Sequence, residues 1–365
     1  MEIKILNNLR SLLLCLFVFW ILIILFPCCS RHDNHTINII ADRTDFHEWE
    51  KLFSFTNPVY LEDSTNSHLG YSRQCFEDNN KIIFVDYNSK KIFCFSNEGK
   101  YLFCIGQIGH AKNEYTDIRD VAIDNINHHL IVLDHKGFIK YDTSTGQFVG
   151  RDEAPSESLD YWSFIPTTSE SYIVHKIRGE FSIEECDGKG IKKLRKSTVQ
   201  QYGSNHFYNY KHKIMIIGDY GDLYIDEYCG KHLVKKYRLD ICGHNLPSGM
   251  KPNDIYTMND LSNSRYFTCI LSAYETEKWL YCLLKGPENN KYHLFYNKST
   301  GETKIGLKDK NDGIVIVGSD NKSFKALFYP DLAEIDSYSW NIIPDIKKDY
   351  HNPVYLSLCI NEQEN

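Results

Sequence analysis

Six apolar runs recur along the 365-residue chain at nearly even spacing, and no other feature of the sequence limits its fold as strongly. The runs start 42 to 53 residues apart and read IIFV at 82, LIVL at 130, YIV at 172, IMII at 214, FTCIL at 267 and IVIV at 314. A four-stranded β-propeller blade takes about 40 to 45 residues. The spacing therefore predicts an all-β chain that folds as a six-bladed β-propeller of four-stranded antiparallel blades.

The first two copies of the repeat also share their turn residues. KIIFVDYNSKKIFCFSNEGKYLFCIG aligns with HLIVLDHKGFIKYDTSTGQFVG, as strand, Asp, turn, strand, Gly turn and strand. Asp86 and Asp134 follow an apolar strand, where a short carboxylate can accept hydrogen bonds from the turn backbone. Gly99 and Gly146 stand where the next hairpin needs a positive φ. The abundance of rings, 25 Tyr and 20 Phe, also suits sheet surfaces.

Two strand-like runs lie outside the six copies, and they predict how the ring closes. A small sheet has two apolar faces, and packing sheets face against face around an axis buries both. NPVYLED at 57–63 precedes the first copy, and VYLSLCI follows Pro353 near the C-terminus. We expect one or both runs to join a blade at the closure, so that early chain pairs with late chain.

A short helix is predicted before the first of these runs. TDFHEWEKLF has apolar residues at helical spacing and Thr44 as a plausible N-cap. We interpret it as a plug or brace on the edge of the propeller. The propeller domain is then predicted to span 44–365, with a lead-in at 44–70, blades at about 71–352 and a closing strand at 353–360.

The first 27 residues have the order of a secretory signal. Two basic residues precede the apolar stretch SLLLCLFVFWILIILFP, which ends at Cys28 and Cys29. LFPC is similar to the bacterial lipobox, so we predict a lipoprotein signal peptide over 1–27 and lipid attachment at Cys28, with Cys29 as the alternative. A hydrated tether is expected over 28–43. The other interpretation is an uncleaved anchor, because these 17 apolar residues approach the roughly 20 that cross a bilayer.

Both interpretations export the body of the chain and leave it attached to a membrane. We therefore predict a location in the cell envelope, as an outer-membrane lipoprotein that faces either the periplasm or the cell surface. The net charge is −7, and it is −8 without the first 27 residues. An acidic body argues against nucleic acid or an anionic membrane as the main partner, because both attract clustered Lys and Arg.

Several short motifs resemble a known family. They are Leu61-Glu62 before the first blade, Val85-Asp86 through Gly99-Lys100 within it, Gly106, Gly109, Glu114 and Tyr115 after it, and Asn352-Pro353-Val354 at the end. Together they resemble the NHL-like six-bladed β-propeller lipoproteins of Gram-negative anaerobes, a family of largely unassigned function. The resemblance covers about Glu48 to Leu358 and implies the fold and the envelope location, but no catalytic residues.

One loop departs from the pattern of this family. His110–Asn113 replaces the run of glycine and proline that the family carries between Gly109 and Glu114. This departure argues against a ligand role for the backbone of the loop. We interpret Glu114 and Tyr115 as a clasp between blades.

No catalytic motif stands out in the sequence. The GxSxG, P-loop and GxGxxG patterns are absent. Asp309–Gly313 is similar to a calcium loop, but Asp320 stands where such a loop has Glu, so we predict a polar turn. The His32–His35 and His128–His129 pairs and the scattered cysteines show no metal-site spacing, and most of the nine body cysteines are expected to be buried. We predict no catalytic residue and no metal site, and the sequence leaves any cofactor open.

Aromatic residues in or near the expected loops are the candidate ligand contacts. These are Tyr161, Trp162, Trp279, Tyr338 and Trp340, whose rings could stack on a sugar or hold a peptide. We favour a non-enzymatic binding or scaffold module for an envelope protein, a peptide or a glycan. The alternative is a metal-dependent, lactonase-like hydrolase or lyase with ligands from several inner strands in the central channel.

The closure hypothesis makes a direct prediction. Deleting residues 353–365 should lower the melting temperature by many degrees, because the last blade would lose its fastening to the early chain. Thermal unfolding followed by circular dichroism would measure the change, and an unchanged melting temperature would contradict the hypothesis.

Overall fold

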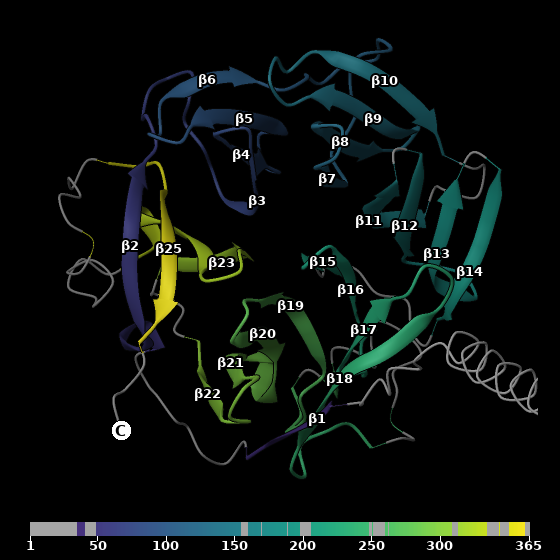
Figure 1. Cartoon of the computed structure of the whole chain (residues 1–365), viewed down its shortest axis with the longest axis vertical. Helices are drawn as coiled ribbons and strands as arrows, with labels where there is room; N and C mark the ends of the chain where they lie inside the picture. The colour runs from purple at the N-terminus through teal and green to yellow at the C-terminus, as the bar shows by residue number, and fades with distance from the viewer. Residues whose placement is uncertain are drawn as a thin grey trace, which may run out of the picture.

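Six sheets stand around a central axis in the computed structural model (Figure 1). The structure describes residues 35–40, 49–154, 160–168, 170–187, 189–197, 206–247, 250, 260–261, 263–308, 313–333, 343 and 350–361. Five of the six sheets in this part of the chain have four strands, and one has five. The predicted all-β, six-bladed propeller is therefore confirmed.

The first five blades follow the chain from the axis outward. Their strands are β3 (Ser72–Asp78), β4 (Lys81–Asp86), β5 (Lys91–Ser96) and β6 (Tyr101–Cys104) in blade one; β7 (Asp120–Asp124), β8 (His129–Asp134), β9 (Gly137–Asp142) and β10 (Phe148–Glu153) in blade two; β11 (Tyr161–Thr168), β12 (Ser171–Lys176), β13 (Phe181–Asp187) and β14 (Gly190–Lys196) in blade three; β15 (Phe207–Tyr210), β16 (Lys213–Ile217), β17 (Tyr224–Tyr228) and β18 (Leu233–Ile241) in blade four; and β19 (Cys269–Glu275), β20 (Trp279–Lys285), β21 (Lys291–Asn297) and β22 (Thr303–Leu307) in blade five.

Blade six combines the two ends of the domain, as the closure hypothesis predicts. Its strand order is β23 (Ile314–Ser319), β24 (Phe324–Phe328), β25 (Val354–Ile360) and β2 (Phe53–Tyr60). β2 runs antiparallel to β25, from Phe53 opposite Ile360 to Tyr60 opposite Val354. The outermost strand of this blade thus comes from the start of the domain and the other three from its end. Two short 3₁₀ turns, Pro287–Asn289 and Pro330–Leu332, lie in the last two blades.

The apolar runs are not all the same strand of a blade. The first four form the second strands β4, β8, β12 and β16, whereas FTCIL and IVIV fall in the first strands β19 and β23. The spacing of the runs stays nearly even despite this shift by one strand, because the 27 residues between β18 and β19 make up the difference. The innermost strands β19 and β23 are as apolar as the second strands of the other blades, because both kinds of strand lie between packed neighbours.

The turn residues shared by the first two copies of the repeat have the predicted roles. Asp86 accepts hydrogen bonds from the N–H groups of Asn88 (2.9 Å) and Ser89 (3.0 Å) in its turn. Its other carboxylate oxygen accepts from the N–H of Gly70 at 3.0 Å, which ties the turn to the first strand. Gly99 has the expected positive φ of 83°.

Asn352 fastens the closing strand to the lead-in. Its side chain is buried, and it donates to the carbonyls of Glu62 (2.7 Å) and Ser67 (2.9 Å) and accepts from the N–H of Leu69 (2.8 Å). Tyr350 donates to the Leu61 carbonyl at 2.6 Å. The Leu-Glu and Asn-Pro-Val motifs of the sequence therefore meet at the closure.

Part of the predicted tether is a strand. β1 (His35–Ile39) pairs in parallel with β18 and adds a fifth strand to blade four, with Ile37 and Ile39 buried. The expectation of a hydrated tether over 28–43 is wrong for these five residues. The alternation of Ile37 and Ile39 with polar neighbours was the available signal, and it is typical of a half-buried strand.

The predicted helix is much shorter in the part of the chain that the structure describes. It consists of the 3₁₀ turn η1 (Trp49–Leu52), and Phe53 already begins β2. Trp49 is fully buried, and its ring stacks on His293 of blade five with 4.1 Å between centroids. The turn thus braces blade five, while Thr44 lies outside the described residues.

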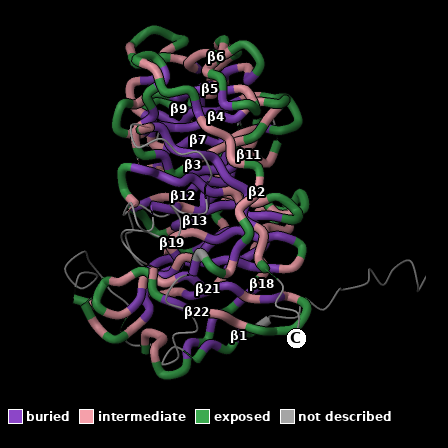
Figure 2. Tube along the Cα trace, turned by 90° about the vertical axis from the view of Figure 1, so that its left-hand side faces the viewer, coloured by how far each residue is buried: buried purple, intermediate pink, exposed green. Residues whose placement is uncertain are grey.

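Figure 2 shows how burial follows this architecture. Buried segments run through the interior of the propeller, and exposed segments gather at the turns on its two faces. Within the described ranges no helix is long and apolar enough to cross a membrane. The predicted signal segment, Cys28 and Cys29 lie outside these ranges.

The role of Asn352 can be tested by truncation. Asn352→Ala should destabilise the fold by about 3 kcal/mol, because it leaves one N–H and two carbonyls without a partner. Chemical denaturation measures this change. Asn97→Ala is the control, since Asn97 is exposed and should change stability by less than about 0.5 kcal/mol; equal effects of both variants would refute the fastening.

Candidate functional site

A cavity of about 670 Å³ lies where the first strands of several blades converge. Its wall comes from β3, β7, β11, β19 and β23, from turns in blades one to three, and from the face of blade five next to blade six. This volume falls in the range of pockets that hold small molecules. The cavity is therefore the main candidate site in the described structure.

The repeat itself builds one mouth of the cavity. Tyr87, His135 and Ile177 each follow the second strand of their blade, and all three line the cavity. They stand at the same position of the repeat in blades one, two and three. An alignment of VDY with LDH could have identified Tyr87 and His135 as a pair, but the sequence does not show that this position faces the axis.

Cations outnumber acids in the cavity wall. Four basic side chains and two carboxyl groups line it, namely Arg73, Arg119, Lys291, Lys308, Asp117 and Asp120. Arg73 is exposed, and its guanidinium lies 5.8 Å from the centre of the Tyr71 ring. No carboxylate among the described residues forms a salt bridge with Arg73, so its charge is available to a ligand.

Arg119 is held by the wall of the cavity. It donates from Nη1 to the carbonyl of Tyr161 at 3.0 Å, and Nη2 contacts Nδ1 of His135. Burial lowers the pKa of this guanidinium from its ordinary value. Arg119 therefore adds positive potential from a fixed position, whereas Arg73 can reach a ligand.

Asp120 forms a buried hydrogen-bonded chain beside these cations. Its Oδ1 accepts from Nε2 of Gln74 (2.7 Å) and Oδ2 accepts from the N–H of Phe164 (2.9 Å). Tyr87 donates in turn to Oε1 of Gln74. Burial raises the pKa of Asp120 to about 7, so the carboxyl is only partly charged near neutral pH.

Two buried polar atoms of the wall have no hydrogen-bond partner among the described residues. They are Oγ of Ser163 and Nε2 of His293, and both residues line the cavity. A buried polar atom without a partner costs free energy, and a bound ligand or water would supply the missing bond. Ser163 lies one residue after Trp162 on the same strand, and both residues line the cavity.

The predicted aromatic contacts divide into three groups. Tyr161 and Trp162 line the cavity, although they belong to strand β11 and not to a loop. Trp279 begins β20 directly after a turn, but its side chain packs in the hydrophobic core and does not line the cavity. Tyr338 and Trp340 lie outside the described residues. Trp162 is half-buried, whereas Tyr161 is fully buried and also packs in the hydrophobic core with Phe138 and Phe164.

The described residues hold no group of three or more His, Cys, Asp or Glu side chains placed to bind a metal ion. His128 pairs with Asp78 at 2.8 Å. Asp320 caps its own turn, accepting from the N–H of Lys322 at 2.7 Å, whereas residues 309–312 of the predicted polar turn lie outside the described residues. The nine described cysteines are free, and Cys94 and Cys282 are among the buried ones.

Glu114 and Tyr115 hold two blades together, which agrees with the clasp interpretation. Tyr115 is fully buried and donates to the carbonyl of Lys90 in blade one at 3.2 Å. The Glu114 carbonyl accepts from Arg151 of blade two at 2.9 Å. The Glu114 carboxylate closes its own loop by accepting from the Ala111 N–H at 2.9 Å.

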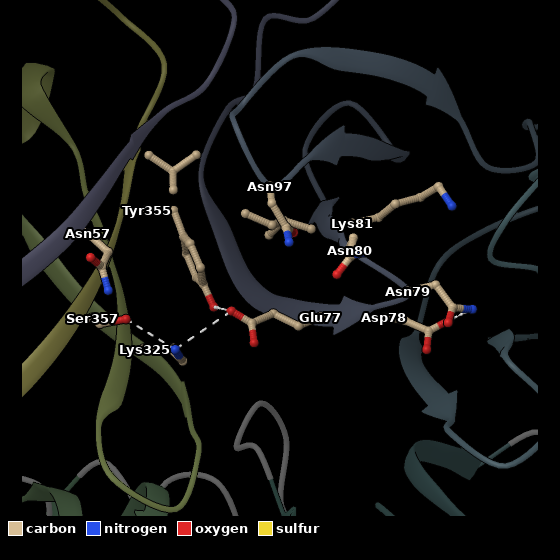
Figure 3. A pocket seen from close by; sticks show the side chains of 12 residues that line it. Asn57, Glu77, Asp78, Asn79, Asn80, Lys81, Asn97, Lys325, Tyr355 and Ser357 are labelled. Atoms are coloured by element: carbon tan, nitrogen blue, oxygen red, sulfur yellow. Dashed lines mark hydrogen bonds and ion pairs between the residues drawn. The ribbon is translucent and has the colours of Figure 1, made fainter.

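A second, polar cavity of about 420 Å³ lies at the seam between blades six and one (Figure 3). Tyr355 of β25 donates to Glu77 of β3 at 2.7 Å, and Lys325 lies 3.1 Å from Oγ of Ser357 and 3.8 Å from Glu77. These polar groups pair with one another across the seam. We therefore interpret this cavity as part of the closure.

Comparison with known proteins agrees with the fold. A family model described as Domain of unknown function (DUF4934) matches residues 48–339. No curated protein matches the sequence. Among solved structures, a Bacteroides fragilis protein described as a candidate exported protein has 16% identity and a TM-score of 0.73, over 90% of this chain and 99% of that one. A Bacteroides vulgatus member of the DUF4221 family has 10% identity and a TM-score of 0.56, over 85% of this chain and 98% of that one.

The raised pKa of Asp120 predicts a pH dependence. The folded state keeps the proton up to about pH 7, whereas the unfolded chain releases it near pH 4. This contribution to stability is complete below pH 4 and is lost as the pH rises through 7. Asp120→Asn stays neutral, so its stability relative to the native chain should rise between pH 4 and 8, by at most about 4 kcal/mol.

Chemical denaturation at a series of pH values measures this difference. The substitution also alters hydrogen bonds, and this changes the free energy of unfolding by the same amount at every pH. The result to compare is therefore the slope of the free energy of unfolding against pH. Parallel stability curves for the two proteins would show that Asp120 ionises normally in the folded state.

Proposed function

Because the chain belongs to the family described as Domain of unknown function (DUF4934), we propose its role from the cavity: it is an exported binding protein of the cell envelope, and the central cavity holds the acidic group of its ligand. The observation that carries this proposal is Arg73, an exposed cation on an aromatic-lined wall that has no carboxylate partner among the described residues. An arginine fork matches a carboxylate in geometry and charge.

The remaining wall residues support a compact ligand with a ring or an apolar body. Tyr71 and Trp162 offer ring faces beside Arg73 and Ser163. Partial protonation of Asp120 near neutral pH reduces the negative charge of the wall. The shared ligand chemistry is thus a carboxylate on a compact body, which an acidic sugar or the C-terminus of a peptide can supply.

The cellular location is proposed from the N-terminal sequence. Residues 1–27 have the order of an export signal, and Cys28 or Cys29 would carry the lipid that attaches the protein to the outer membrane. The similar fold of a Bacteroides protein described as a candidate exported protein supports export. The ligand would then be met in the envelope.

Isothermal titration with paired ligands tests the binding role. A uronic acid is compared with its neutral parent sugar, and a short peptide with a free C-terminus is compared with its amide. We expect one acidic member to bind and its neutral counterpart to bind at least about tenfold more weakly. Binding of neither acidic ligand, or equal binding within both pairs, would contradict the proposal.

Substitution of Arg73 tests the site. Arg73→Ala should weaken binding of the acidic ligand at least about tenfold and leave stability unchanged, because the side chain is exposed. Arg265→Ala is a matched control, since Arg265 is also exposed and lies 5.3 Å from the ring centre of Tyr266, away from the cavity. Equal weakening by both substitutions would place the ligand elsewhere.

A further inference from the structure

β1 determines where the N-terminal segment leaves the propeller. It pairs with β18 from His35 opposite Tyr237 to Ile39 opposite Ile241. β18 is the last strand of blade four, so β1 lies at the outer rim of the ring (Figure 1). Ile37 and Ile39 are buried, which anchors the strand by hydrophobic contact as well as by backbone hydrogen bonds.

The predicted lipid site is close to this rim along the chain. Six residues separate Cys28 from His35. A fully extended chain spans at most about 3.5 Å per residue, so the lipid-bearing residue stays within about 25 Å of His35. Lipid attachment would therefore hold blade four near the bilayer.

The same rim carries exposed cations without acidic partners. Lys231, Lys235 and Arg238 lie in β18 or just before it, and all three are exposed. None of them forms a salt bridge with a described carboxylate. Lys235 lies 4.5 Å from the centre of the Tyr224 ring. Lys193 and Lys196 of β14 add exposed cations on the neighbouring rim of blade three, although Lys196 pairs with Glu180 at 3.6 Å.

Protection of a sheet edge explains only one of the three cations at β18. Exposed lysines often blunt an edge strand and prevent pairing with another chain. β1 pairs with β18 only from Tyr237 to Ile241, so the edge is covered at Arg238 and open at Lys235. Edge protection therefore accounts for Lys235, whereas Lys231, in the turn before the strand, and Arg238 need another reason.

Exposed apolar side chains accompany these cations. Ile40, directly after β1, is 63% exposed, and Leu307 at the end of β22 is 42% exposed. β22 is the outer strand of blade five, and β1 contacts it. Basic and apolar side chains together are the composition that binds the interface of an anionic membrane.

We propose that the rim formed by β1 and β18 rests on an anionic lipid surface, with Lys231, Lys235 and Arg238 on the headgroups. The inference rests on the proposed lipid anchoring. Since the net charge of the chain is −7, such a surface repels the protein as a whole and attracts it only through this rim. The propeller axis then lies along the membrane plane, and the mouth of the central cavity opens sideways.

Lysine footprinting of the full lipidated chain in vesicles tests the proposal. The chain is reconstituted in phosphatidylcholine alone or mixed with phosphatidylglycerol, and an amine reagent is followed by mass spectrometry. Labelling of Lys231 and Lys235 should fall at least about threefold in the anionic vesicles, and high salt should restore it. Lys91 and Lys100 on blade one should be labelled equally in both.

A charge-reversal variant and a matched control complete the experiment. K231E/K235E/R238E should abolish the anionic-lipid protection of Lys193 and Lys196, whereas K91E/K100E/K112E, with the same change of charge, should keep it. A chain that sediments with the vesicles but is labelled uniformly would overturn the rim contact alone. A chain that does not sediment with them would overturn the anchoring and this inference together.

Discussion

The structure depends on the burial of both apolar faces of each small sheet. A single blade cannot meet this requirement, because each blade needs a neighbour on either side, and only a closed ring provides one for all six. The core between blades six and one shows the consequence, since it joins Phe84 and Phe95 of the early chain to Leu327 and Tyr355 of the late chain. The polar bonds of Asn352 hold these strands in register. Hydrophobic packing supplies the driving force at this seam, and the polar bonds select the position.

The repeat that builds the ring also places the candidate site. Asp86 and Asp134 hold equivalent turns by accepting backbone N–H groups, so these positions have little freedom to vary. The next residue is Tyr87 in one blade and His135 in the other, and both line the cavity. In each blade, the residue that holds the turn is thus followed directly by a residue that lines the cavity. A propeller can change its ligand at such positions without disturbing the turn.

The sequence predicted the architecture well because burial leaves a periodic record. It predicted six blades, the pairing of early and late strands, and the turn roles of Asp86 and Gly99. It did not distinguish the two runs that form inner strands from the four that form second strands, because inner and second strands are equally apolar. The cavity was harder to predict, since Arg73, Asp120 and Ser163 come from separate blades and no spacing connects them. Only Tyr161 and Trp162 were identified in advance, as aromatic residues in or near a loop, and they begin strand β11.

The N-terminal segment adds strands to two blades and also carries the proposed membrane tether. β1 joins blade four and β2 completes blade six, so this segment spans blade five, which Trp49 also contacts. A tether that leaves from a flexible loop would let the propeller turn freely on the membrane. The proposed tether would instead join a paired strand whose Ile37 and Ile39 are buried, each side chain contributing about 1.5 to 3 kcal/mol of hydrophobic stabilisation. In the proposed anchoring, folding therefore determines that blade four is the part of the propeller nearest to the membrane.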